Sequence, residues 1–231
     1  MKSLPQRLLG ALERFNAAHP WDHNAHYHRW ILRQLPRRVE RALDVGCGTG
    51  DLVRRLAVRA DAVHGIDADP AIVDRARELT EAAAAAATAG PGAAPGRIAF
   101  DVATAPAGIP PLSFDALTCV ATVHHLPFAE ALNAFRKHVA PGGTLVIVGL
   151  ARADTPGDHL LGAAAIPMNL AMGWIRNKGR AVHVRPVSMT APTRPASMTF
   201  TEITSTARTV LPGARLRRRL FWRYTLVWRN D

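Results

Sequence analysis

Five short apolar runs, separated by helical patterns and loops, constrain the fold of this chain more than any other feature. The runs cover residues 39–46, 62–67, 97–102, 114–121 and 144–150. Helical patterns cover residues 51–59, 70–86 and 127–140. Strands that are apolar on both faces and alternate with helices are typical of a parallel sheet covered on both sides. The sequence therefore predicts an α/β fold.

The pattern changes after Leu150. Residues 152–198 hold an apolar helical stretch and then a segment rich in Pro, Thr, Ser and Met, which we expect to form a cap insertion. A helix over 199–211 and two strands, roughly 214–221 and 223–229, follow and predict an antiparallel hairpin that closes the sheet. We expect one domain over 1–231, divided into an N-terminal helical lid (1–38), a core (39–151), the cap insertion (152–198), and a final helix with hairpin (199–231).

The charge is uneven along the chain. Of 29 basic residues 26 are arginine, and 18 acidic residues leave a formal net charge of +11. Residues 1–60 carry +6, residues 61–150 carry −4, and residues 151–231 carry +9. Basic ends can favour nucleic acid or an acidic small molecule. They can also be arginine-rich surface that reflects base composition, so both readings stay open here.

Two cysteines, Cys47 and Cys119, lie far apart without metal-ligand spacing, which favours free thiols in a reducing compartment. The N-terminus lacks the apolar core of a signal peptide. The longest apolar run, Leu160 to Trp174, is too short to span a bilayer. We expect a cytoplasmic protein with no membrane contact and no bound metal; the sequence says nothing about its oligomeric state.

A glycine-rich loop follows the first apolar run, with glycine at every second position: Gly46, Gly48 and Gly50. Glycines at a strand end allow a tight turn and a close approach of backbone to ligand. The dinucleotide fingerprint would place its third glycine where Asp51 stands, and the Lys-Ser/Thr pair of a phosphate loop is absent. Asp44 would repel a pyrophosphate and attract an ammonium group.

Two further strand ends carry acids. Asp67 ends the second strand and can accept both hydroxyls of a ribose. Asp101 and Val102 end the third strand, where a carboxylate and a backbone N–H could bind an adenine edge. The implied ligand has a ribose, an adenine and an amino group but no phosphate, and S-adenosylmethionine fits that description.

The chain resembles the class I S-adenosylmethionine-dependent methyltransferases, of the small-molecule type that includes the ubiquinone and menaquinone biosynthesis group. The resemblance rests on LDVGCGTGDL at 43–52, GID at 65–67, FDV at 100–102, SFDALTCVATVHHLP at 113–127 and VAPGGTLVIVG at 139–149. It implies a Rossmann-like sheet of seven strands whose last strand is antiparallel, with S-adenosylhomocysteine as product. The cofactor-binding residues that it implies are Asp44, Gly46, Gly48, Gly50, Asp67, Asp101 and Val102. We also predict cofactor contacts for Cys47, Ala68, Ala121 and Tyr27.

The candidate catalytic residues are His124 and His125, which follow the fourth strand where this fold opens on the transferred methyl group. Histidine titrates near neutrality, so either could remove a proton from the acceptor. The alternative is that one of them caps the following helix or bonds a backbone carbonyl.

A stretch rich in aromatic residues and histidine, from His19 to Trp30, is predicted to cover the cofactor, with Tyr27 reaching the methionine side. A helix that packs its aromatic side chains on the sheet is the alternative. The predicted substrate-binding residues are His23, His26, Met168 and Trp174.

Our leading hypothesis is methyl transfer by in-line displacement to an oxygen or nitrogen of a small molecule in secondary metabolism. The basic charge balance would favour an acidic acceptor, and an aromatic acceptor is the other expectation. The sequence contains neither Asn/Asp-Pro-Pro-Tyr nor Pro-Cys after the fourth strand, which argues against two classes of nucleobase enzyme. We expect no nucleic-acid partner. An RNA methyltransferase that uses the basic ends, and a non-catalytic cofactor-binding partner protein, are the competing interpretations.

Overall fold

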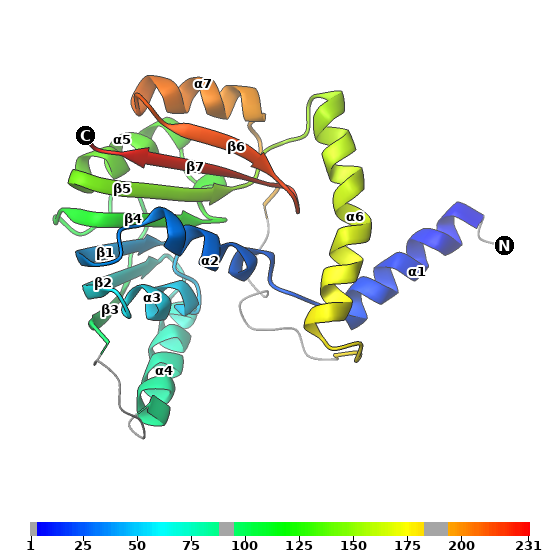
Figure 1. Cartoon of the computed structure of the whole chain (residues 1–231), viewed down its shortest axis with the longest axis horizontal. Coiled ribbons are helices and arrows are strands. Elements are labelled where there is room, and N and C mark those ends of the chain that lie inside the picture. The colour runs from blue at the N-terminus through cyan, green and yellow to red at the C-terminus, as the bar shows by residue number, and fades with distance from the viewer. Residues whose placement is uncertain (1–3, 88–94, 183–193) are drawn as a thin grey trace.

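Seven strands form one sheet in the computed structural model, which describes residues 4–87, 95–182 and 194–231. Their order is β3-β2-β1-β4-β5-β7-β6; the first five are parallel, and β7 is antiparallel to both neighbours (Figure 1). The strands are β1 Val39–Val45, β2 Ala60–Asp67, β3 Arg97–Val102, β4 Phe114–Val120, β5 Val139–Gly149, β6 Arg215–Arg219 and β7 Arg223–Arg229. The predicted α/β sheet with a reversed last strand is confirmed.

Helices cover both faces of this sheet and one of its ends. On one face lie α2 (His23–Gln34), α3 (Asp51–Leu56) and α4 (Pro70–Ala87), and on the other lie α5 (Phe128–His138) and α7 (Phe200–Val210). The helices α1 (Leu4–Ala18) and α6 (Pro156–Arg176) contact each other and stand beyond one end of the sheet (Figure 1). A short 3-10 helix, η1 (Val123–His125), follows β4.

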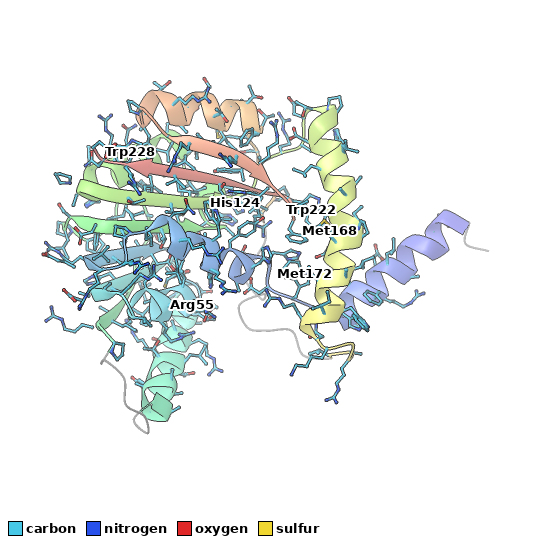
Figure 2. The ribbon with its side chains drawn as sticks, viewed as in Figure 1. Arg55, His124, Met168, Met172, Trp222 and Trp228 are labelled. Carbon is cyan, nitrogen blue, oxygen red and sulfur yellow. The ribbon has the colours of Figure 1, made fainter. Side chains whose placement is uncertain are left out.

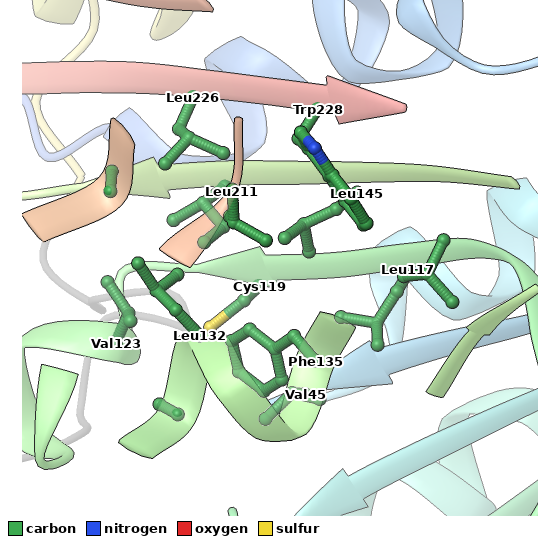
Figure 3. Close-up of a cluster of buried hydrophobic side chains, with 14 of the residues drawn as sticks. Val45, Leu117, Cys119, Val123, Leu132, Phe135, Leu145, Leu211, Leu226 and Trp228 are labelled. Carbon is green, nitrogen blue, oxygen red and sulfur yellow. The ribbon is translucent and has the colours of Figure 1, made fainter. Parts of the chain in front are cut away.

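The core is divided by the sheet into two layers, because the central strands are apolar on both faces. Figure 3 shows the layer between the sheet and α5, where the side chains of the strands meet those of the helix. Complete burial of one such aliphatic or aromatic side chain contributes about 1.5–3 kcal/mol relative to exposure. The labelled members are Val45, Leu117, Cys119, Val123, Leu132, Phe135, Leu145, Leu211, Leu226 and Trp228.

Two helices begin with reciprocal caps that explain where they start. Thr155 accepts a hydrogen bond from the Asp158 N–H while the Asp158 carboxylate accepts from Thr155, and Pro156 occupies the first turn of α6. Thr199 and Glu202 form the same capping box at the start of α7. Both helices are therefore fixed at their first residue by local sequence.

Several boundaries differ from the sequence prediction. β5 begins at Val139 rather than near residue 144, because Val139 pairs with Phe114 across an irregularity in the β4–β5 ladder. The helix expected over 51–59 ends at Leu56. These shifts are small, and the order of the elements is unchanged.

The segment expected to be a lid, residues 1–38, is divided in the structure. α2 packs on the sheet through Tyr27, Ile31 and Leu35, whereas α1 lies against α6. Of the expected cap insertion, residues 183–193 lie outside the described residues. Among those described, no helix is long and apolar enough to cross a membrane.

Candidate functional site

The loop at residues 46–50, here called the glycine loop, follows β1 at the edge of the sheet where the parallel strands end. All three of its glycines have left-handed backbone angles, with φ of +71° at Gly46, +52° at Gly48 and +74° at Gly50. A Cβ atom at Gly46 would lie 2.0 Å from Oγ1 of Thr122, so the loop after β4 leaves no room for a side chain there. The conformation of the loop therefore favours glycine at all three positions, and at Gly46 the space does so as well.

Asp44 lies just before this loop and is 2% exposed. Its Oδ1 accepts a hydrogen bond of 2.7 Å from the Thr118 hydroxyl, across the β1–β4 pairing. Burial raises the pKa of the Asp44 carboxyl to about 7, although the Thr118 hydrogen bond acts in the opposite direction. Among the described residues no cation lies within ion-pair distance of it. A ligand with a positive charge would supply the missing partner.

Asp67, at the end of β2, supports the glycine loop from the next strand. Its carboxylate accepts a 3.0 Å hydrogen bond from the Gly48 N–H and a 3.1 Å hydrogen bond from the Asp69 N–H. Asp101 and Val102 end β3 and pair with Ile66 and Asp67. The acids of three neighbouring strands therefore share one edge of the sheet.

Three smaller residues predicted to bind the cofactor lie beside these acids in the chain. Ala68 follows Asp67 and is exposed. Ala121 follows β4 with a φ of +51°, and its N–H donates to the Val148 carbonyl at 2.7 Å. Cys47 is buried, and burial raises the pKa of its thiol, so the sulfur fills space as a neutral group.

His124 and His125 form most of η1, and their rings lie 4.0 Å apart. His125 is exposed, whereas Nδ1 of His124 is buried without a hydrogen-bond partner. Burial, together with the charges of His125 and Arg223, lowers the pKa of His124 to about 4. His124 is therefore neutral near pH 7 and has a nitrogen free to accept a proton. In the view of Figure 2 it lies at the end of the sheet that faces α6.

The aromatic stretch is anchored to α6 by one buried side chain, Asn169. Its Oδ1 accepts hydrogen bonds from Trp21 Nε1 at 2.8 Å and from His23 Nε2 at 2.7 Å. Its Nδ2 donates to Asn16 of α1 at 2.8 Å. Asn169 therefore joins α1, the start of α2 and α6 in one network, as a satisfied buried amide should.

The other residues predicted to contact cofactor or substrate from the lid and the cap insertion differ in their burial and hydrogen bonds. The Tyr27 hydroxyl, predicted to reach the methionine side of the cofactor, donates to the Leu220 carbonyl at 2.7 Å. Nδ1 of His26 is buried without a partner. Met168 and Trp174 of α6 are 41% and 53% exposed. The roles predicted for these residues stay predictions.

A side-chain contact joins α2 to the start of α3, directly after the glycine loop. Nδ1 of His28 lies 3.0 Å from Oδ2 of Asp51, which also accepts a 3.2 Å hydrogen bond from Arg55. These contacts, with His28 the largest, lower the pKa of the Asp51 carboxyl to about 2. Asp51 thus has a structural partner at the position where a dinucleotide fingerprint has glycine.

Comparisons with known proteins identify the family. The family model described as "Methyltransferase domain" matches residues 42–143. An uncharacterized methyltransferase of Mycobacterium bovis is 32% identical over 214 residues, which cover 91% of this chain and 97% of the relative. The chain belongs to the class I S-adenosylmethionine-dependent methyltransferases. The resemblance inferred from the strand-end motifs is thereby confirmed, and the narrower likeness to the ubiquinone and menaquinone group stays a prediction.

Further comparisons agree with the fold of this methyltransferase. The N-methyltransferase NodS of Bradyrhizobium japonicum, solved with S-adenosylhomocysteine, aligns with a TM-score of 0.55 at 18% identity over 96% of this chain and 97% of NodS. Magnesium protoporphyrin IX methyltransferase of Synechocystis aligns with a TM-score of 0.57 at 13% identity over 100% and 89%. Trans-aconitate 2-methyltransferase of Streptomyces avermitilis is 34% identical over 131 residues, which cover 55% of this chain and 45% of that enzyme.

Sequence reasoning did not identify several residues that shape the site of the methyltransferase. Thr118 and Thr122 lie within the motif at 113–127 but were not predicted to shape the site, and only the pairing of β4 with β1 brings them to Asp44 and Gly46. Asn169 lies within the apolar stretch that forms α6, where its side chain was not expected to form a hydrogen-bond network. Arg223, grouped by sequence with the other arginines near the C-terminus, lies instead beside Asn24 of α2. A lone polar residue inside the apolar stretch 160–174 was the only available signal for Asn169.

Proposed function

We propose that this methyltransferase transfers a methyl group from S-adenosylmethionine to an oxygen or nitrogen of a small molecule. When bound, S-adenosylmethionine supplies a methyl group on a positively charged sulfonium. The observation that carries the cofactor part is the buried Asp44 carboxylate beside the glycine loop. This buried carboxyl group has no ion-pair partner among the described residues, and the cofactor has the ammonium group that would pair with its ionised form.

The roles of the other residues follow from their positions. Gly46, Gly48 and Gly50 would let the backbone contact the methionine part, and Asp67 would accept the ribose hydroxyls. Asp101 and Val102 would contact the adenine. Neutral His124 would accept the proton of a hydroxyl or ammonium nucleophile. The helices α1 and α6, held by Asn169, would exclude water from the acceptor and orient it.

A small acceptor is supported by the arrangement at the carboxyl end of β5. A hollow there lies between α6, the strands β6 and β7 and the segment after β5. The Streptomyces relative is named for trans-aconitate, a small molecule. A place in secondary metabolism rests on the family resemblance alone.

The proposal is tested by isothermal titration of the protein with S-adenosylmethionine and S-adenosylhomocysteine, followed by transfer of labelled methyl to extracts. We expect binding of both compounds and label in the small-molecule fraction. Label only in the RNA fraction would favour the RNA methyltransferase. Binding without any transfer would favour the non-catalytic interpretation, and absence of binding would overturn all three.

The pH dependence of cofactor binding should follow Asp44. Because burial raises the pKa of its carboxyl to about 7, the free protein holds a neutral Asp44 below that pH. An ammonium ligand requires the ionised form, so we expect the affinity for S-adenosylhomocysteine to fall by about tenfold per pH unit below 7. Titrations between pH 5.5 and 8 measure this, and a flat profile would contradict it.

The free energy of unfolding should change with pH in the direction opposite to the cofactor affinity. The folded protein binds more protons at Asp44 than the unfolded chain does between about pH 4 and pH 7, because the pKa in the fold is raised. The contribution of Asp44 to the free energy of unfolding therefore decreases as pH rises through this window. Comparison with Asp44→Asn, which lacks the titrating group, isolates the effect.

His124 and His125 should differ as bases. Replacing His124 with glutamine keeps a polar side chain but removes the ability to take up a proton, so we expect kcat to fall by about 100-fold, within the range for general bases. His125→Gln is the matched control, and we expect little change because that side chain is exposed. Affinity for S-adenosylmethionine should be unchanged in both variants. Equal losses, or none for His124→Gln, would contradict the assignment.

A further inference from the structure

Arg223 is a half-buried arginine whose guanidinium forms no ion pair with a carboxylate. It begins β7, and its neighbour Tyr224 pairs with Gly149, the last residue of β5. This places Arg223 at the carboxyl edge, beside the predicted acceptor site. Burial lowers the pKa of its guanidinium. Such a group is costly to bury unless a partner is provided.

The hydrogen bonds of Arg223 leave most of its donors free. Nη2 donates to Oδ1 of Asn24 at 3.0 Å, and Nη1 donates to the Phe221 carbonyl at 3.3 Å. Both acceptors are neutral. Nε is buried and has no hydrogen-bond partner. Since a guanidinium has five N–H donors, three remain after these two bonds.

No acidic residue is paired with Arg223 in the structure. All 18 acidic residues lie among those described, because residues 1–3, 88–94 and 183–193 contain neither aspartate nor glutamate. None of the 18 forms an ion pair with Arg223. Asp22, which exerts some attraction on it, is engaged as the N-cap of α2 and accepts from the Asn24 and Ala25 N–H groups.

The surroundings of Arg223 connect it to the reacting side of the site. Its positive charge lowers the pKa of both His23 and His124, so the guanidinium lies within electrostatic reach of the cap and of the loop after β4. It also lines the hollow beside α6 together with Trp222 and Tyr224. Arg223 thus lies at the hollow beside α6 and within electrostatic reach of η1.

The hollow itself has an excess of positive charge. Four arginines line it, Arg152, Arg218, Arg219 and Arg223, against the single carboxylate of Asp158. That carboxylate is already paired with Arg218. Arg219 lies over the Trp30 ring at 5.1 Å and donates to Thr225 at 3.2 Å. Arg152 and Arg223 have neither an ion pair nor an aromatic partner among the described contacts. Arg152 is exposed, whereas Arg223 is half-buried and its Nε is buried without a hydrogen-bond partner.

We propose that the methyl acceptor is a carboxylic acid whose carboxylate binds the Arg223 guanidinium. This inference rests on the proposed function and specifies its substrate class. A planar carboxylate matches the fork of arginine donors, and a charge-assisted pair of this kind is stronger than a neutral hydrogen bond. The aromatic side chains of the hollow, Trp222, Tyr224 and Phe200, would contact the apolar part of the acid. Arg223 acts in recognition of the acceptor, and His124 remains the candidate base.

The direct test titrates acetate, the smallest organic carboxylate with an apolar group, into protein saturated with S-adenosylhomocysteine. The arginine Nε–Hε resonances are followed by NMR, and that of Arg223 is assigned by its absence in Arg223→Lys. We expect a saturable shift with acetate and none with acetamide or with chloride at equal ionic strength. An equal response to acetate and acetamide, or no response, overturns the proposal.

A second test uses turnover. A small-molecule extract that accepts labelled methyl is divided, and in one half the carboxylates are converted to amides with methylamine and a carbodiimide; the other half receives the amine alone. We expect transfer only in the second half. In Arg223→Met the KM for the active fraction should rise at least tenfold, and Arg223→Lys should recover part of the loss.

Controls separate this proposal from the proposed function. Arg229→Met, at the exposed far end of β7, should leave KM unchanged. If S-adenosylhomocysteine fails to bind the wild-type protein, the proposed function fails. If it binds while the amidated extract is still methylated, or while Arg223→Met keeps the wild-type KM, only the assignment of a carboxylate acceptor fails.

Discussion

Replacing Asp44 with asparagine is expected to weaken binding of S-adenosylmethionine by about 30-fold or more without unfolding the protein. Loss of one member of a buried charged pair costs about 2–5 kcal/mol in binding, and each 1.4 kcal/mol is about tenfold in affinity. Asparagine keeps the shape of the side chain and an oxygen that can accept from the Thr118 hydroxyl. The change therefore removes charge from the site and little else.

The stability of Asp44→Asn should behave differently from its affinity. Above pH 7 the wild-type protein must bury an ionised carboxylate, since its pKa is about 7. The amide has no such cost, so we expect the thermal midpoint of the variant at pH 8 to equal or exceed that of the wild type. Isothermal titration and thermal unfolding at pH 8 measure the two quantities on the same samples.

Asp115→Asn is the matched control for this experiment. Asp115 lies at the opposite edge of the sheet, where its Oδ2 accepts hydrogen bonds of 2.9 Å from the N–H groups of Glu40 and Arg41. That substitution should leave cofactor affinity unchanged. If Asp44→Asn bound S-adenosylmethionine within threefold of the wild type, Asp44 would have no role in holding the ammonium group.

The second large effect is expected from Gly46→Ala, which should destabilise the fold and abolish cofactor binding. The new Cβ would lie 2.0 Å from Oγ1 and 2.6 Å from Cβ of Thr122, so rotation of the threonine side chain cannot remove the overlap. Overpacking of this kind costs about 1–3 kcal/mol, and the left-handed φ of +71° adds about 1–2 kcal/mol. The glycine loop and the loop after β4 must move apart to make room for the new Cβ atom.

Gly48→Ala separates the two causes. Gly48 also has a left-handed φ, of +52°, but a Cβ atom there would meet nothing within 4 Å. We expect it to lose about 1–2 kcal/mol from backbone strain alone. Chemical denaturation of both variants measures the difference. Equal destabilisation of Gly46→Ala and Gly48→Ala would mean that contact with Thr122 does not constrain the loop.

Much of the architecture was predictable because its causes are local. Apolar runs fixed the identity of the strands, with β3 matching the prediction at both ends, and capping residues such as Thr199 fixed helix starts. The position of Asp44, Asp67 and Asp101 at one edge follows from the same reasoning, since parallel strands end on the same side. These features need no knowledge of which residues meet across the molecule.

The site beyond that edge was not predictable because it depends on distant contacts. Asn169 lies 148 residues from Trp21, and Arg223 lies 199 residues from the Asn24 oxygen that it contacts. Strand register brings Thr118 to Asp44, and a shift of one residue would turn its side chain to the other face. Chain composition contains no information on such pairs.

By itself, the sequence determined the sheet, the glycine loop, the acids at the strand ends and the family of the enzyme. It also showed a net charge of +11, but left open whether the excess is surface or function. The tertiary structure distinguishes one residue within that excess. Packing of α2 against β7 leaves Arg223 half-buried without a carboxylate partner, and our proposal that it recognises the acceptor rests on this contrast with solvated surface charges.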